Sequence, residues 1–193
     1  MTLALPAGPA PPPRRQLLVG TAVGSAAAVM LIGGMLAIWI LQRERALAAD
    51  EPWLPPGVEI PGVATNVMLI TMLTIPLFAQ WAVYAARRGE RAHLGVALGL
   101  VGLLGIAAVN AQAYVYAQLD MAVADSGYAP MFYAITGVVV ALIIIGIVAT
   151  AVTAFRVLGG RDADTELVAA HALWWYVLAA IFSAIWLIVF VTK

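Results

Sequence analysis

Residues 126–155, SGYAPMFYAITGVVVALIIIGIVATAVTAF, contain no Asp, Glu, Lys or Arg. A helix that crosses a bilayer needs roughly 20 mostly apolar residues, because the hydrocarbon layer is about 30 Å thick. This 30-residue stretch is long enough, and its centre, VVVALIIIGIVATAV, is almost entirely apolar. It therefore predicts a transmembrane helix.

Four other windows also lack these four charged residue types, at 16–42, 60–86, 92–119 and 167–192. The whole chain is 64% hydrophobic and only 10% charged, whereas soluble domains average about 25% charged residues. The pattern predicts an all-α integral membrane protein with five transmembrane helices. We expect these helices at roughly 17–41, 65–86, 94–118, 130–155 and 169–191.

The charged residues between the windows predict the orientation. Seven arginines fall on the side of the N-terminus, and two arginines and one lysine fall on the other side. Cytoplasmic loops carry an excess of Lys and Arg, so we expect the N-terminus inside and the C-terminus outside. Residues 1–15 are rich in Pro and Ala and predict a disordered cytoplasmic tail, followed by a transmembrane domain at 16–193.

The chain lacks the residues that several kinds of chemistry require. The chain has no cysteine, which excludes disulfides and thiolate metal sites. Its two histidines, His93 and His171, start predicted helices, where polar interfacial roles are favoured over a shared metal. No window holds an ionisable carboxylate or amine for ion coupling, and no basic run suits nucleic acid. We therefore expect no cofactor and no metal in this chain, and a function that depends on packing against a partner.

Small and polar residues mark candidate packing surfaces. Two pairs have the spacing that allows helices to approach closely in membranes, Gly20 with Gly24 and Gly95 with Gly99. Asn110, Tyr114 and Gln118 are spaced four residues apart and so share one face of the predicted helix. For them we favour hydrogen bonds between helices over a transport path.

Further expectations concern the proline and the aromatic residues. Pro76 should free the carbonyl of Met72, with Thr71 and Thr74 close enough to satisfy the backbone. Trp39 and Trp53, and the cluster around Trp174 to Tyr176, are typical of interfacial anchors.

Short motifs in order along the chain resemble cytochrome c oxidase subunit III in its short five-helix bacterial form. They include QWAVYAARRGER at 80–91, NAQAYVYAQL at 110–119, FYAITG at 132–137 and LWWYV at 173–177. The resemblance covers about 17–192, and Gly20 and Arg43 keep the spacing of the family's first helix. The family-matching structural positions are Gln80, Gln112, Tyr114, Thr136, Gly137 and Trp175.

The departures from the family pattern are systematic. Each position where the family has an ionisable residue within the membrane holds a neutral residue here: Ala28, Val115, Val139, Leu142, Tyr176 and Ala179. Loss of these groups together is physically consistent, because one remaining charge in hydrocarbon would be costly.

The resemblance implies a non-catalytic subunit of a haem–copper terminal oxidase in aerobic respiration. Haem and copper would belong to the partner, oxidase subunit I together with subunit II, and membrane lipid would lie between two arms, helices one and two against helices three to five. The location would be the bacterial plasma membrane, crossed several times. The alternative is a membrane subunit of another complex, such as a nitric oxide reductase-like assembly or a small transporter module.

The predicted orientation can be tested directly. A reporter that is active only outside the cytoplasm should be active when fused at Lys193, because the seven-to-three distribution of Arg and Lys places that end outside. Activity restricted to a cytoplasmic reporter at the same residue would contradict the orientation.

Overall fold

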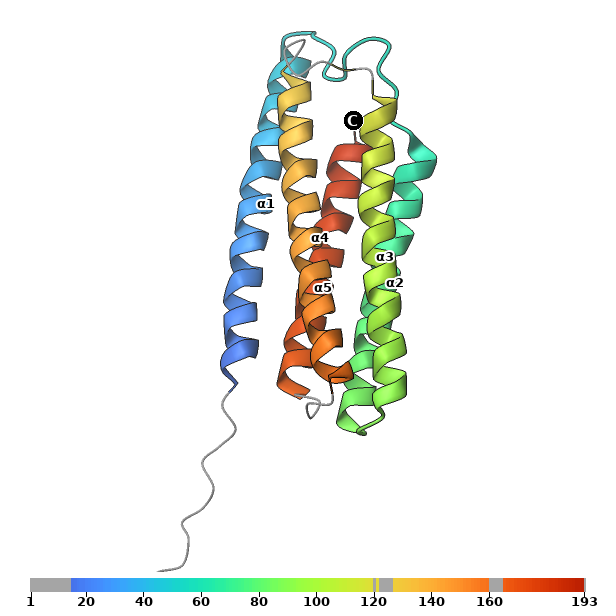
Figure 1. Ribbon diagram of the computed structural model, residues 1–193. Coiled ribbons are helices and arrows are strands. Elements are labelled where there is room, and N and C mark those ends of the chain that lie inside the picture. Colours follow the sequence, from blue (N-terminus) through green and yellow to red (C-terminus); the bar gives the residue numbers. More distant parts are fainter. Residues whose placement is uncertain (1–14, 120, 122–126, 160–164, 193) are drawn as a thin grey trace, which may run out of the picture.

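Five long helices make up the computed structural model, which describes residues 15–119, 121, 127–159 and 165–192 (Figure 1). The helices are α1 (Gln16–Ala48), α2 (Gly62–Arg87), α3 (Arg91–Gln118), α4 (Tyr128–Leu158) and α5 (Thr165–Ile185), and a π-helical end, η1 (Trp186–Val191), continues α5. All five are long and apolar enough to cross a membrane. The predicted five-helix membrane fold is confirmed. The predicted tail lies almost entirely outside the described residues.

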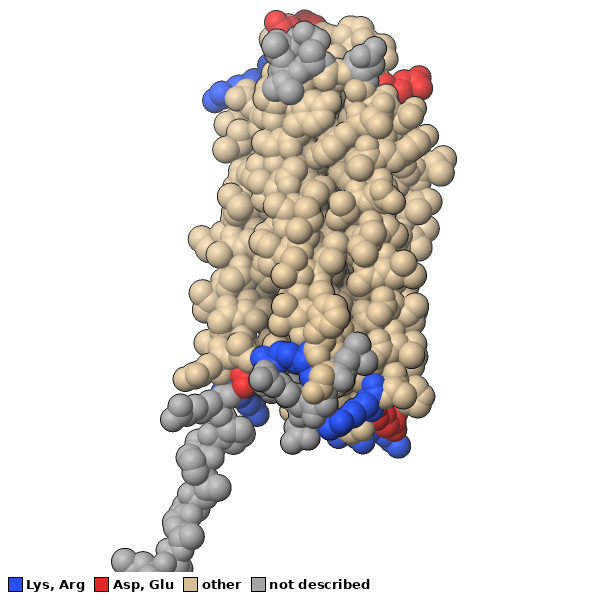
Figure 2. Space-filling model, in the orientation of Figure 1, with Lys and Arg blue, Asp and Glu red and all other residues tan. Residues whose placement is uncertain are grey.

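The charged residues gather at the two ends of the bundle, and a wide uncharged band separates them (Figure 2). The helices run past the predicted limits into these charged ends. α1, for example, continues through Arg43 and Arg45 and ends at Ala48, before the proline-rich segment that starts at Pro52. Charged residues can remain helical in the solvated headgroup layer, whereas successive prolines cannot.

The helices pack side by side around α5. α5 contacts α1, α2 and α4, while α2 also packs along α3, and α3 packs along α4. α1 lies at one edge of the bundle against α5 and α4, and α2 lies on the opposite side against α3 (Figure 1). The expectation that the first two helices form one arm is therefore wrong.

A tight turn at Gly89, with φ of 69°, joins α2 and α3, and glycine adopts this backbone conformation without steric cost.

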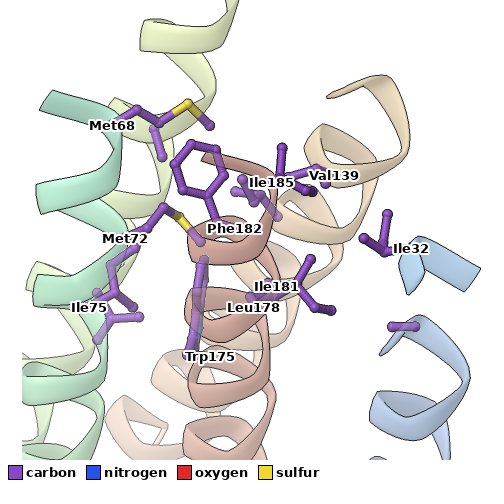
Figure 3. Close-up of a cluster of buried hydrophobic side chains, with 14 of the residues drawn as sticks. Ile32, Met68, Met72, Ile75, Val139, Trp175, Leu178, Ile181, Phe182 and Ile185 are labelled. Atoms are coloured by element: carbon purple, nitrogen blue, oxygen red, sulfur yellow. The ribbon is translucent and has the colours of Figure 1, made fainter. Parts of the chain in front are cut away.

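The core contains buried residues from all five helices and is almost entirely apolar, and Figure 3 shows the part of it around α5. Met68, Met72 and Ile75 of α2 are fully buried, as are Trp175 and Ile185 of α5. In a bilayer such contacts stabilise through close packing rather than through removal of water. The fit between side chains therefore determines which helices pair.

Trp175 occupies the closest approach between three helices. A Cβ atom added at Gly105 of α3 would lie 3.0 Å from the Trp175 ring and 2.9 Å from Ile147. One added at Gly146 of α4 would lie 2.9 Å from the same indole. These two glycines leave the space that the Trp175 ring fills. The expectation that this tryptophan anchors the protein at the membrane interface is wrong, because none of its surface is exposed.

A second aromatic group closes the other end of the bundle. The rings of Trp39, Trp53 and Tyr128 contact one another edge to face, with centroids 4.9 to 5.4 Å apart. Trp39 and Trp53 are buried, so the expectation that they anchor the protein at the membrane interface is wrong. Instead they fix the loop after α1 to the start of α4.

The threonines near Pro76 bond to carbonyls other than the expected one. Thr71 donates its hydroxyl to the carbonyl of Val67 at 2.8 Å, and Thr74 donates to that of Ile70 at 2.7 Å. Neither bonds to the carbonyl of Met72. Each side chain instead reaches its own preceding turn, the common arrangement for a hydroxyl inside a helix.

The Trp175 contact predicts opposite effects for two matched substitutions in α4. Gly146→Ala should lower the stability by about 1–3 kcal/mol, because the new methyl group overlaps the indole. Gly137→Ala should be neutral or raise the stability by up to about 1 kcal/mol, because nothing lies within 4 Å of its added Cβ and alanine favours a helix. Thermal unfolding in mild detergent measures both. Equal stability of the two variants would contradict the packing.

Candidate functional site

Polar side chains form links between the helices within the membrane band. Tyr116 of α3 donates a hydrogen bond to Thr136 of α4 at 2.7 Å. Tyr176 of α5 donates to Gln80 of α2, and beyond it Trp186 donates to Asn66 of α2 at 3.0 Å.

Hydrogen bonds between transmembrane helices stabilise a bundle because lipid offers no alternative partner. These three hydrogen bonds thus connect α3 with α4, and α2 with α5 and its π-helical end. Gln80 and Thr136, two of the family-matching positions, belong to these contacts.

A fourth link combines three buried side chains of α4 and α5. The Thr150 hydroxyl oxygen lies 2.7 Å from His171 Nε2, and the Trp175 indole nitrogen lies 3.1 Å from both atoms. The Thr150 hydroxyl also donates a hydrogen bond to the carbonyl of Gly146 at 2.8 Å. The indole N–H is therefore satisfied at the point where its ring fills the gap between α3 and α4.

The two histidines have different environments. His93 is exposed at the start of α3, and its Nδ1 lies 2.8 Å from Glu90, as expected for a polar interfacial residue. The hydrogen bond from His93 and the nearby Arg88 lower the pKa of the Glu90 carboxyl. His171, by contrast, is only 4% exposed and bonds to Thr150 inside the bundle, so the expected role of an interfacial residue is wrong for it. Their different partners do not favour a metal shared by the two histidines.

A groove of about 500 Å³ lies between α1, α4 and α5. Gly20 and Gly24 line it from α1, Ala149 and Thr153 line it from α4, and His171 lines it from α5. Nothing lies within 4 Å of a Cβ added at either glycine. Within this chain the Gly20–Gly24 pair thus opens a mostly apolar space beside α1 and brings no other helix close.

Glu166 of α5 contacts the start of α1, next to Leu17, which lines the groove. Its Oε1 atom accepts hydrogen bonds from the backbone N–H groups of Leu17 at 2.8 Å and Leu18 at 3.2 Å. The first N–H groups of a helix have no partner within the helix, and a carboxylate there also interacts favourably with the helix dipole. Glu166 therefore caps α1 from a residue 149 positions along the chain.

The polar residues of α3 divide between the interior and the outer surface. Gln112 is 1% exposed and faces the interior. Asn110, Tyr114 and Gln118 are exposed and lie on the face that points away from the other helices. The expectation that this series links helices is wrong within the described part of this chain. Gly99 lies on the same exposed side, with nothing within 4 Å of its added Cβ.

Within the described ranges, no three His, Cys, Asp or Glu side chains are grouped so that they could hold a metal ion. The chemistry that the described side chains offer is hydrogen bonding and close packing. This arrangement can hold helices, and through them a neighbouring protein, in fixed positions.

The sequence patterns did not indicate several residues of these contacts, namely Asn66, Gly105, Gly146, Thr150, Glu166 and Trp186. The position of Glu166 in the first turn of α5 is typical of acidic residues, which are favourable there. The sequence gives no sign that Glu166 also caps α1. Neither Gly105 nor Gly146 has a glycine or alanine four residues away, so neither belongs to a recognisable small-residue motif. Both instead contact the large indole ring of Trp175.

Comparison with known proteins identifies relatives for most of the chain. A family model described as Cytochrome c oxidase subunit III matches residues 51–193. A probable cytochrome c oxidase subunit 3 of Rickettsia bellii is 27% identical over 168 residues, which cover 82% of this chain and 56% of that protein. Its counterpart in Rickettsia felis is 32% identical over 141 residues, 70% of this chain and 46% of that protein.

The cytochrome c oxidase subunit 3 of Corynebacterium diphtheriae is 25% identical over 179 residues. The match covers 90% of this chain and 85% of that protein. The chain therefore spans about half the length of the two Rickettsia proteins and most of the length of the Corynebacterium protein.

The cap of α1 can be tested by amide hydrogen exchange. Glu166→Ala should speed exchange at Leu17 and Leu18 by about fivefold to thirtyfold, because loss of a helix cap costs about 1–2 kcal/mol. Glu44→Ala, at an exposed glutamate that pairs with Arg43, should leave both amides unchanged. Equal exchange in Glu166→Ala and the wild type would contradict the cap.

Proposed function

Because this chain belongs to the cytochrome c oxidase subunit III family, we propose that it is a non-catalytic, subunit III-like component of a haem–copper terminal oxidase. It is a multi-pass membrane protein with five spanning helices. In this role it binds the catalytic subunit within the membrane and stabilises it. The observation that carries the proposal is the family match over residues 51–193, which includes four of the five spans.

The contacts between helices support a structural role. The hydrogen bonds that join α2 to α5, α3 to α4 and α4 to α5 involve no Asp, Glu, Lys or Arg side chain. No Asp, Glu, Lys or Arg occurs in the five uncharged windows, so these windows offer no carboxylate or amine that could carry a proton across the membrane. A rigid bundle of this kind suits a supporting subunit.

The partners follow from the proposal. The catalytic subunit I would hold the haems and copper, subunit II would complete the complex, and this chain would hold none of these groups. Membrane lipid would fill apolar spaces such as the groove beside α1. The complex would lie in the bacterial plasma membrane, with the N-terminus of this chain in the cytoplasm.

The family-matching positions have two kinds of role in this proposal. Gln80, Thr136 and Trp175 join helices of this chain through the contacts described above. Gln112 lies in the interior and Tyr114 on the outer face of α3, while Gly137 lies one residue after Thr136 and has free space around it. The first group positions the helices, and Tyr114 is available to a partner.

One observation favours the alternative assembly. Ala28, Val115, Val139 and Ala179 are buried, and they stand where the family pattern has ionisable residues. A chain that has lost these groups could serve a different membrane complex, such as a nitric oxide reductase-like assembly or a small transporter module. The metal content of the partner separates these possibilities.

Purification of the tagged chain from its native membrane in mild detergent tests the proposed function. We expect a larger partner to be retained, with haem absorbance and copper present in stoichiometric amounts. Haem together with non-haem iron but without copper would favour the nitric oxide reductase-like assembly. Purification of the chain without any haem-bearing partner would contradict the proposal.

A further inference from the structure

The start of α1 is held to the bundle differently from the rest of the helix. None of residues 16–24, all of which the structure describes, is buried, and only Leu18 and Thr21 among them are half-buried. From residue 25 onward one face of α1 enters the core, through Ser25, Ala28, Ile32, Leu36 and Trp39. α1 is therefore anchored by its later turns. Residues 16–24 form a distinct segment, which we call the α1 flap.

The α1 flap forms one wall of the groove beside α1. The described residues that α1 contributes to the groove all belong to the flap, namely Gln16, Leu17, Gly20, Thr21 and Gly24. The opposite wall consists of side chains from α4 and α5. The width of the groove therefore depends on where the flap lies.

Glu166 holds the free end of the α1 flap. Its carboxylate accepts the backbone N–H groups of Leu17 at 2.8 Å and Leu18 at 3.2 Å, so the first turn of α1 is fastened to α5. In a bilayer, close packing and hydrogen bonds hold helices together. Because the flap has no buried residue to provide close packing, it depends on hydrogen bonds of this kind to stay against α5.

The α1 flap meets the anchored part of the helix at Gly24 and Ser25. Sharp bends in helices occur at prolines, at Gly/Ser pairs and at π-bulges, and a Cβ atom added at Gly24 has open space around it. The Ser25 side chain is buried, and its hydroxyl bonds to no described group. A serine hydroxyl that bonds to the carbonyl four residues earlier often bends its helix. A bend at this point would therefore give Ser25 a partner in the carbonyl of Thr21.

We propose that the α1 flap is a hinged lid of the groove, with Gly24 and Ser25 as its hinge and Glu166 as its latch. With the latch closed, the flap lies beside α5 as in the structure. When the latch opens, the flap bends away from α4 and α5, and the groove widens. The flap is about 14 Å long at about 1.5 Å per residue, so a bend of about 20° moves its free end by roughly 5 Å.

Two substitutions open the latch from opposite sides. Glu166→Ala removes the acceptor, and Leu17→Pro removes the donor of the shorter hydrogen bond at a position in the first turn, where a helix tolerates proline. Because the chain has no cysteine, introduced cysteines can carry a pair of spin labels. One pair, at Val19 and Val148, joins the flap to α4, and a second pair, at Met30 and Val148, joins the anchored part of α1 to α4. All three labelled positions are exposed.

The distances between the labels are measured in the full-length chain, purified from its native membrane with the partners that it retains. Each latch variant should add a population in which the Val19–Val148 distance is roughly 5 Å longer, while the Met30–Val148 distance stays unchanged. Glu44→Ala, near the other end of α1, is the control and should change neither distance.

The outcomes separate a lid from a rigid helix. A longer Val19–Val148 distance in either latch variant, with an unchanged Met30–Val148 distance, supports the proposal. An unchanged Val19–Val148 distance in both variants overturns it. An equal change in both distances also overturns it, because α1 then moves as one piece or leaves the bundle.

The hinge is tested in chains that already carry Glu166→Ala. Adding Gly24→Ala should reduce the population with the longer distance by roughly twofold to fivefold, because alanine favours a regular helix over a bent one. Gly34→Ala is the matched control, since a Cβ atom added there also has open space but lies in the anchored part of α1, and it should leave this population unchanged. An equal effect of the two alanines would overturn the hinge at Gly24.

Discussion

The indole of Trp175 is the contact on which the arrangement of the central helices depends. Its ring fills the space that Gly105 and Gly146 leave free, and its N–H bonds to Thr150 and His171. In a bilayer, close packing and hydrogen bonds hold helices together, since the lipid is as apolar as the side chains. One side chain here provides both, between α3, α4 and α5. The hydrogen bonds of Thr136 with Tyr116 and of Gln80 with Tyr176 then fix the positions of α3 and α2 around this point.

The number of helices could be predicted from sequence because a charged residue is costly in hydrocarbon and none interrupts the five windows. The pairing of the helices could not be predicted in the same way. α1 and α2 are neighbours in sequence but lie on opposite sides of the bundle, and every face of each helix is apolar enough for lipid. Burial of a face therefore leaves no periodic signal. A polar residue indicates which helices pair only when its hydrogen-bonding partner is known. For Gln80, Thr136 and Trp175 the partners became known only from the structure.

The same reason explains the errors on the aromatic residues. Tryptophan is enriched at membrane interfaces, but it also offers the largest packing surface of any side chain. Trp39, Trp53 and Trp175 serve the second purpose, and sequence position near a helix end does not distinguish the two. The buried neutral residues at Ala28, Val115 and Val139 show a related compromise. The described interior is mostly apolar, so the fit of side chains and a few hydrogen bonds from polar side chains hold it together.

The cap that Glu166 places on α1 has a consequence for the assembly of the chain in the membrane. Of the five described helices, α1 is synthesised before the others, yet it packs mainly against α5, which follows the other four in the chain. Until residue 166 leaves the ribosome, the first N–H groups of α1 lack this partner, and one side of the helix has only lipid beside it. The bundle is thus closed by the contact between α1 and α5. A nascent chain that stops before α5 would leave α1 inserted but without its principal neighbour, a state that the quality control of the membrane could distinguish from the finished protein.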